Sequence, residues 1–116
     1  MTVRDLEPAD VAHRMAEHSV LLIDVREPDE YAIERIRGAL LYPLSTFDPR
    51  ALPGTGSVKI VFQCGSGMRS ARAMASAVAV GLPIAGHLVG GIKAWKEAGF
   101  PVISTDPATG KLHEPR

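Results

Sequence analysis

The only cysteine of this 116-residue chain lies in a segment whose residue types suit anion binding and nucleophilic chemistry. Cys64 follows an apolar run, 58–63, and precedes the loop Gly65-Ser66-Gly67-Met68-Arg69-Ser70 and an alanine-rich segment expected to be helical, 71–80. The two glycines allow successive backbone N–H groups to point at one spot, and the helix that follows adds its positive end there. Such an environment lowers the pKa of a thiol and makes it a nucleophile.

A lone cysteine is more often a small buried hydrophobic residue than a reactive group. For Cys64, the position after a strand, the glycine-rich loop and the nearby Arg69 favour function. We therefore predict Cys64 as the catalytic residue. The predicted substrate-binding residues are the five that follow it: Gly65, Ser66, Gly67, Met68 and Arg69.

Short apolar strands and helical segments alternate along the chain, which indicates how Cys64 is positioned. Predicted strands cover 20–24, 39–42, 58–63 and 87–89, and predicted helices cover 9–17, 28–36, 71–80 and 92–98. This alternation predicts an α/β fold with an open, mostly parallel central sheet and helices on both faces. Ligands in such folds bind beyond the carboxyl ends of the strands, which is where Cys64 falls. We assign residues 1–103 to one domain and expect 104–116 to be a loosely ordered tail.

Composition excludes several classes of protein. The chain has 13 Lys+Arg against 13 Asp+Glu, and this zero net charge argues against nucleic-acid partners and a polybasic membrane surface. One cysteine excludes an internal disulfide and multi-cysteine metal sites, and His13 and His18 do not share a helix face. We expect no metal, no cofactor, no membrane span and a cytoplasmic location.

Four stretches together resemble the rhodanese-like domain family, in its order and spacing. They are Leu22-Ile23-Asp24-Val25-Arg26-Glu27-Pro28-Asp29-Glu30-Tyr31, Ile36-Arg37-Gly38-Ala39, the loop from Cys64 to Ser70, and Gly90-Gly91-Ile92-Lys93-Ala94-Trp95. The resemblance implies a sulfurtransferase in which Cys64 takes the outer sulfur of a small anionic donor such as thiosulfate and becomes a persulfide. Since the chain has no second cysteine, the acceptor is external: cyanide, a small thiol or the thiol of a partner protein.

Two other functions stay open. Dual-specificity phosphatases resemble rhodaneses but have five residues between cysteine and arginine, whereas this chain has Gly65 to Met68. The shorter loop disfavours a phosphatase or an arsenate reductase. A catalytically silent or redox-sensing binding module is the third interpretation. The chain also departs from the family at Arg35, where a histidine is frequent, and at Gly65, where many members carry arginine.

The remaining polar and aromatic candidates have structural interpretations. Asp24 and Arg26 are expected to hold the first turns and the Cys64 loop by hydrogen bonds. Arg72 is interpreted as a solvated charge, His87 as a packed or turn histidine, and Trp95 as core.

Overall fold

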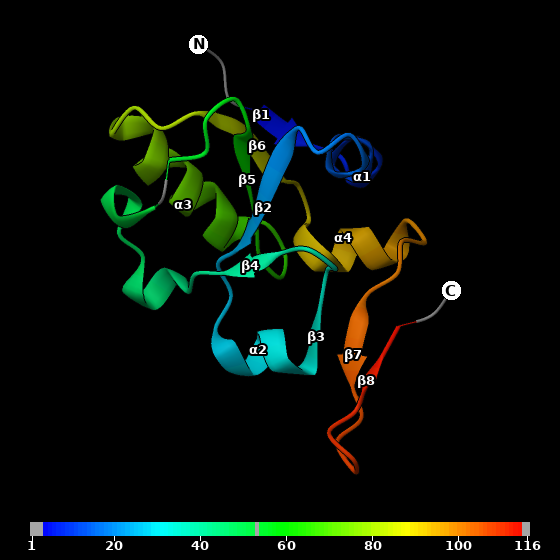
Figure 1. Ribbon diagram of the computed structural model, residues 1–116. Helices are drawn as coiled ribbons and strands as arrows, with labels where there is room; N and C mark the ends of the chain where they lie inside the picture. The colour runs from blue at the N-terminus through cyan, green and yellow to red at the C-terminus, as the bar shows by residue number, and fades with distance from the viewer. Residues whose placement is uncertain (1–3, 53, 115–116) are drawn as a thin grey trace.

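The computed structural model describes residues 4–52 and 54–114 and contains a five-stranded parallel sheet (Figure 1). The sheet order is β1-β6-β5-β2-β4. Its strands are β1 (Arg4–Leu6), β2 (Val20–Asp24), β4 (Leu40–Leu41), β5 (Lys59–Gln63) and β6 (Ile84–Leu88). The helices are α1 (Pro8–Ala16), α2 (Pro28–Ile33), α3 (Met68–Ala79) and α4 (Gly91–Glu97), with 3₁₀ turns η1 (Leu44–Thr46) and η2 (Pro49–Ala51).

Helices cover both faces of this sheet, as Figure 1 shows with α3 on one side and α1 and α4 on the other. Strand β5 supplies both cores because its side chains alternate. Val61 packs with Val11 of α1 and Trp95 of α4, whereas Phe62 and Cys64 pack with Ala73 of α3. The predicted fold class is confirmed: all pairings in the five-stranded sheet are parallel. None of the helices in the described part of the chain is long and apolar enough to cross a membrane.

The structure differs from the predicted elements at both ends of the chain. Strand β1 was not predicted, because three residues carry too little periodicity to distinguish a strand from a loop. A second sheet, β3 (Glu34–Arg35), β7 (Ile103–Thr105) and β8 (Leu112–His113), was not predicted either. Where the sequence suggested a loosely ordered tail from 104, β7 and β8 form an antiparallel hairpin beside α2 (Figure 1). The polar residues of this hairpin give no alternating apolar pattern from which strands could be predicted. In the structure β7 also pairs with β3, in the antiparallel direction.

A buried ion pair at the end of β2 fixes the loop that leads to α2. Asp24 is fully buried and accepts hydrogen bonds from the backbone N–H of Arg26 at 2.9 Å and from its Nη2 at 2.9 Å. The same Nη2 donates to the carbonyl oxygen of Glu34 at 2.7 Å. Two buried charges are tolerated only when their hydrogen bonds are satisfied, and here both are. Asp24 and Arg26 therefore hold the turns at the carboxyl end of β2.

Replacing Asp24 by alanine should destabilise the fold strongly, because it leaves the Arg26 guanidinium buried without its partner. We expect Asp24→Ala to lower the free energy of unfolding by about 3–5 kcal/mol. Glu97→Ala, at an exposed position of α4, serves as control and should change it by less than about 0.5 kcal/mol. Urea unfolding followed by circular dichroism measures both. Equal stability of the two variants would contradict this role of the ion pair.

Candidate active site

The sulfur of Cys64 is surrounded by hydrogen-bond donors from the segment 64–70, hereafter the cysteine loop. Cys64 directly follows β5 and is 1% exposed. The backbone N–H groups of Gly67 and Ser70 donate to its Sγ at 3.1 and 3.3 Å. The hydroxyl oxygen of Ser70 lies 3.5 Å from the same Sγ. The sequence predicted that successive N–H groups of this loop point at one spot, and those of Gly67 and Ser70 both point at the sulfur.

These contacts favour the thiolate over the thiol. Burial raises the pKa of Cys64, since charge is disfavoured away from water. The Ser70 hydroxyl and the backbone N–H groups of Ser70, Gly67 and Ser66 stabilise the anion and outweigh burial. The net effect lowers the pKa of the Cys64 thiol below its ordinary value. A thiolate held in this way is suited to nucleophilic attack.

Two glycine positions give the cysteine loop its shape. Gly67 is the N-cap of α3 with φ of 107°, a conformation that favours glycine. It turns the chain into the helix, and its own N–H and that of Ser70 in the first turn of α3 face the sulfur. From the other side, the N-terminus of α4 supports the loop: the N–H of Ile92 donates to the carbonyl oxygen of Cys64 at 2.8 Å, and that of Lys93 to Gly65 at 3.2 Å.

Gly91 permits this close approach of α4. A Cβ at Gly91 would lie 2.6 Å from the carbonyl carbon and oxygen of Gly65, and closer still to the carbonyl oxygen of Cys64. Real Cβ atoms do not approach backbone so closely. The Gly90-Gly91 pair of the sequence is therefore explained by packing against the cysteine loop.

Arg69 is held by an acidic partner that the sequence analysis did not connect to it. Its Nη1 and Nη2 donate to the two carboxylate oxygens of Glu30, on α2, at 2.6 and 3.0 Å. This bond to Arg69 lowers the pKa of Glu30 to about 2, so that the carboxylate is charged throughout the physiological range. Gly65 leaves room for the pair, because a Cβ there would be 3.1 Å from Nη2 of Arg69. The charge of Arg69 at the site is accordingly offset by Glu30.

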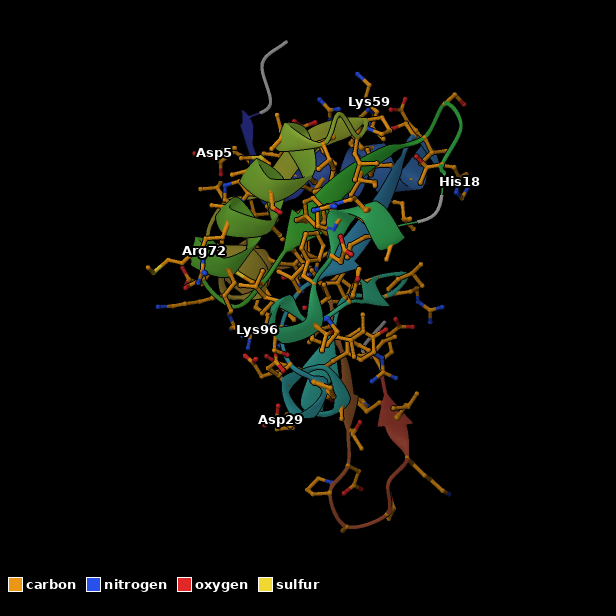
Figure 2. The ribbon with its side chains drawn as sticks, turned by 90° about the vertical axis from the view of Figure 1, so that its left-hand side faces the viewer. Asp5, His18, Asp29, Lys59, Arg72 and Lys96 are labelled. Atoms are coloured by element: carbon orange, nitrogen blue, oxygen red, sulfur yellow. The ribbon has the colours of Figure 1, made fainter. Side chains whose placement is uncertain are left out.

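The other predicted residues lie around the loop in different ways. Ser66 contributes its N–H toward the sulfur, whereas the side chain of Met68 is 78% exposed. Arg72 points outward from α3 in Figure 2. Trp95 is buried in the core, and its Nε1 donates to the carbonyl oxygen of Pro101 at 2.9 Å. Within 4–52 and 54–114, no three His, Cys, Asp or Glu side chains group in a way that fits a metal ion.

Sequence reasoning missed the side chains behind the sulfur. His87, on β6, is buried, and its Nδ1 lies 2.8 Å from the Ser70 hydroxyl. Its Nε2 lies 2.8 Å from Oδ1 of Asp5, on β1. His87 was interpreted as a packed or turn histidine, and burial is correct, but its partners are 17 and 82 residues away in sequence. No local signal marks such pairs.

Comparisons with known proteins agree with this fold. The model of the rhodanese-like domain family matches residues 7–98. A sulfurtransferase of Allochromatium vinosum is 31% identical over 105 residues, covering 90% of this chain and 98% of that protein. An uncharacterized Synechocystis protein is 36% identical over 103 residues, covering 89% of this chain, which spans only 58% of that protein's length. The crystal structure of a rhodanese-related protein from Thermoplasma volcanium superposes with a TM-score of 0.74 at 31% identity, covering 85% and 96% of the two chains.

The chain belongs to the rhodanese-like domain family. The resemblance stated from four sequence stretches is thereby confirmed. The Allochromatium vinosum relative, which is matched over nearly its whole length, is named a sulfurtransferase.

A matched pair of glycine substitutions tests the support that α4 gives the cysteine loop. Gly91 and Gly99 both have positive φ, but a Cβ at Gly99 would meet nothing within 4 Å. We expect Gly99→Ala to lose about 1–2 kcal/mol of stability from its backbone conformation and to leave alkylation of Cys64 unchanged. Gly91→Ala should lose about 1–3 kcal/mol more and slow that alkylation, because it displaces the loop. Unchanged alkylation kinetics in Gly91→Ala would contradict this.

Proposed function

We propose that this domain transfers sulfane sulfur through a persulfide on Cys64. The observation that carries the proposal is the convergence of the Gly67 and Ser70 N–H groups on one buried sulfur. Preorganised N–H donors stabilise negative charge without the cost of reorganising water. They suit both the attacking thiolate and the persulfide anion that replaces it.

In the first step the Cys64 thiolate attacks the outer sulfur of the donor. A bond forms between Sγ and that sulfur, and the sulfur–sulfur bond of the donor breaks. With thiosulfate, the electron pair of the broken bond leaves with sulfite. In the second step cyanide or a thiolate attacks the outer sulfur of the persulfide, and the Cys64 thiolate is regenerated. Neither step needs an added oxidant or reductant.

Access to the sulfur favours a small donor. Since Cys64 is 1% exposed, a slim terminal atom reaches it more easily than a bulky group. The pairing of Arg69 with Glu30 leaves the loop N–H groups as the main attraction for an anion. Cys64 is the one cysteine of the chain, so no internal thiol can remove the bound sulfur. The acceptor is therefore cyanide, a small thiol or a thiol of a partner protein.

The contacts of Arg69 weigh against phosphate-ester hydrolysis. Arginine binds a phosphoryl group through a pair of parallel N–H donors, and the guanidinium has such a pair at Nη1 and Nη2 and another along its Nε edge. In this chain Nη1 and Nη2 of Arg69 are both engaged by Glu30. A phosphate would have to bind at the remaining Nε edge, beside a carboxylate that stays negatively charged because the same arginine lowers its pKa to about 2. The short cysteine loop and this ion pair both favour sulfur transfer.

Intact-mass measurement after incubation with thiosulfate tests the proposal, with Cys64→Ala as control. We expect the wild-type mass to rise by one sulfur atom and to return to its initial value on addition of cyanide. The control should show neither change, because it has no sulfur nucleophile. A wild-type protein that is fully alkylated by iodoacetamide but gains no sulfur would contradict sulfur transfer and favour a redox-sensing or binding role.

A further inference from the structure

Four side chains form a continuous line of hydrogen bonds from the reacting sulfur to the edge of the sheet. Ser70 Oγ lies 3.5 Å from Cys64 Sγ and 2.8 Å from Nδ1 of His87. Nε2 of His87 lies 2.8 Å from Oδ1 of Asp5. Asp5 and His87 are direct partners in the register of β1 and β6, so the sheet itself holds them together. Figure 2 shows Asp5 at the periphery of the molecule. His87 is buried. We call Cys64, Ser70, His87 and Asp5 the relay.

The chemistry of each group sets the direction of the hydrogen bonds. An ionised Asp5 only accepts, so Nε2 of His87 carries the hydrogen between them. In a neutral imidazole the other nitrogen, Nδ1, is then an acceptor. The single hydrogen of the Ser70 hydroxyl has two acceptors in reach, Nδ1 of His87 at 2.8 Å and the carbonyl oxygen of Gly67 at 3.2 Å, and the shorter contact is the one to His87. The oxygen of Ser70 is left to accept the hydrogen of the Cys64 thiol. The three hydrogen bonds therefore run in one direction, from the thiol to Ser70, from Ser70 to His87 and from His87 to Asp5.

We propose that His87, oriented by Asp5, is a positioning residue that takes the Cys64 proton through Ser70. The thiol proton passes to Oγ of Ser70 while the hydroxyl proton of Ser70 passes to Nδ1 of His87. Sulfur gains one negative charge, the imidazole gains one positive charge, and the carboxylate of Asp5 offsets the latter. This inference rests on Cys64 as the reacting group, as proposed above.

After the transfer, the hydrogen bonds run in the opposite direction. The Nδ1–H of the imidazolium donates to Oγ of Ser70, and the Ser70 hydroxyl donates to the thiolate. The thiolate thereby gains the Ser70 hydroxyl as a donor in addition to the N–H groups of Ser66, Gly67 and Ser70. Protonation of His87 and ionisation of Cys64 consequently favour each other.

Other charged groups near the relay are separately accounted for. The described elements packed around it carry Lys59 on β5, Arg69 and Arg72 on α3, Lys93, Lys96 and Glu97 on α4, Asp29 and Glu30 on α2, and the Asp24–Arg26 pair after β2. Of these, Asp29, Arg72, Lys93, Lys96 and Glu97 are exposed. Arg69 is paired with Glu30, and Asp24 with Arg26. Lys59 begins β5, at the opposite end of the strand from Cys64. The proton acceptor in contact with Ser70 is His87.

The pH dependence of Cys64 alkylation by iodoacetamide tests the relay without any sulfur donor. His87→Gln keeps a polar side chain but cannot take a proton. We expect its alkylation rate near neutral pH to fall about tenfold, equivalent to a displacement of the pH profile by about one unit toward alkaline pH. Asp5→Asn should move the profile in the same direction by less. The matched controls are His13→Gln and Glu17→Gln, which disrupt an exposed histidine–carboxylate pair on α1 and should reproduce the wild-type profile.

A double-mutant cycle separates the relay from a merely structural effect. If His87 acts through the Ser70 hydroxyl, His87→Gln should add nothing to the slower alkylation of Ser70→Ala. The relay would be overturned if His87→Gln slowed alkylation by the same factor in the wild type and in Ser70→Ala. It would also be overturned if the pH profile of His87→Gln overlaid that of the wild type. If His87→Gln does not fold, the alkylation profile of Asp5→Asn tests the relay instead. The side chain of Asp5 is 68% exposed, so this substitution leaves the core intact. An unchanged profile in that variant would overturn the proposal equally.

The outcomes distinguish this inference from the proposed function. Alkylation reports the ionisation of Cys64, whereas the mass measurement reports sulfur transfer. A displaced profile in a protein that gains no sulfur would retain the relay and remove the sulfurtransferase assignment. The reverse combination would remove the relay alone.

Discussion

A negatively charged sulfur buried in a protein must be held by hydrogen-bond donors, and much of this structure depends on that constraint. Water cannot solvate Cys64, which is almost fully buried, so the N–H groups of Gly67 and Ser70 take the place of water. Donors of this kind are available where a strand ends and a helix begins, because the first N–H groups of a helix have no partner within it. The junction of β5 and α3 meets this requirement.

The rest of the fold keeps those donors in place. The N-terminus of α4 binds the carbonyl oxygens of Cys64 and Gly65, so the loop is held on the side opposite α3. Glu30 holds Arg69, the residue that follows the first helical position of α3. The buried Asp24–Arg26 pair fixes the turn leading to the helix that carries Glu30. Residues far from the sulfur thus help to stabilise the thiolate, because they hold the backbone N–H groups around it in place.

The sequence predicted the parts of the site that are local. Cys64, the glycines and the helix after them are consecutive, so their geometry follows from short-range rules. Glu30, His87 and Asp5 were not connected to the site, because their hydrogen-bond partners are distant in sequence. Glu30 is 39 residues from Arg69, His87 is 17 residues from Ser70, and Asp5 is 82 residues from His87. Only the tertiary fold brings these pairs together. Strand β1, which carries Asp5, is three residues long and has no pattern of its own. The parallel sheet was predictable from the alternation of strands and helices, whereas the small sheet of β3, β7 and β8 depends on contacts between distant segments.

A stabilised thiolate can be tested by comparing the ionisation of Cys64 in the native protein and in the same protein unfolded in urea. Thiolate absorbance is measured against pH, with Cys64→Ala as blank. We expect a lower pKa for Cys64 in the native state, since its hydrogen bonds outweigh burial. Because the folded pKa is depressed, this contribution to stability is full above the unfolded pKa and is lost as pH falls through the folded one. A native pKa equal to or above the unfolded value would contradict a stabilised thiolate.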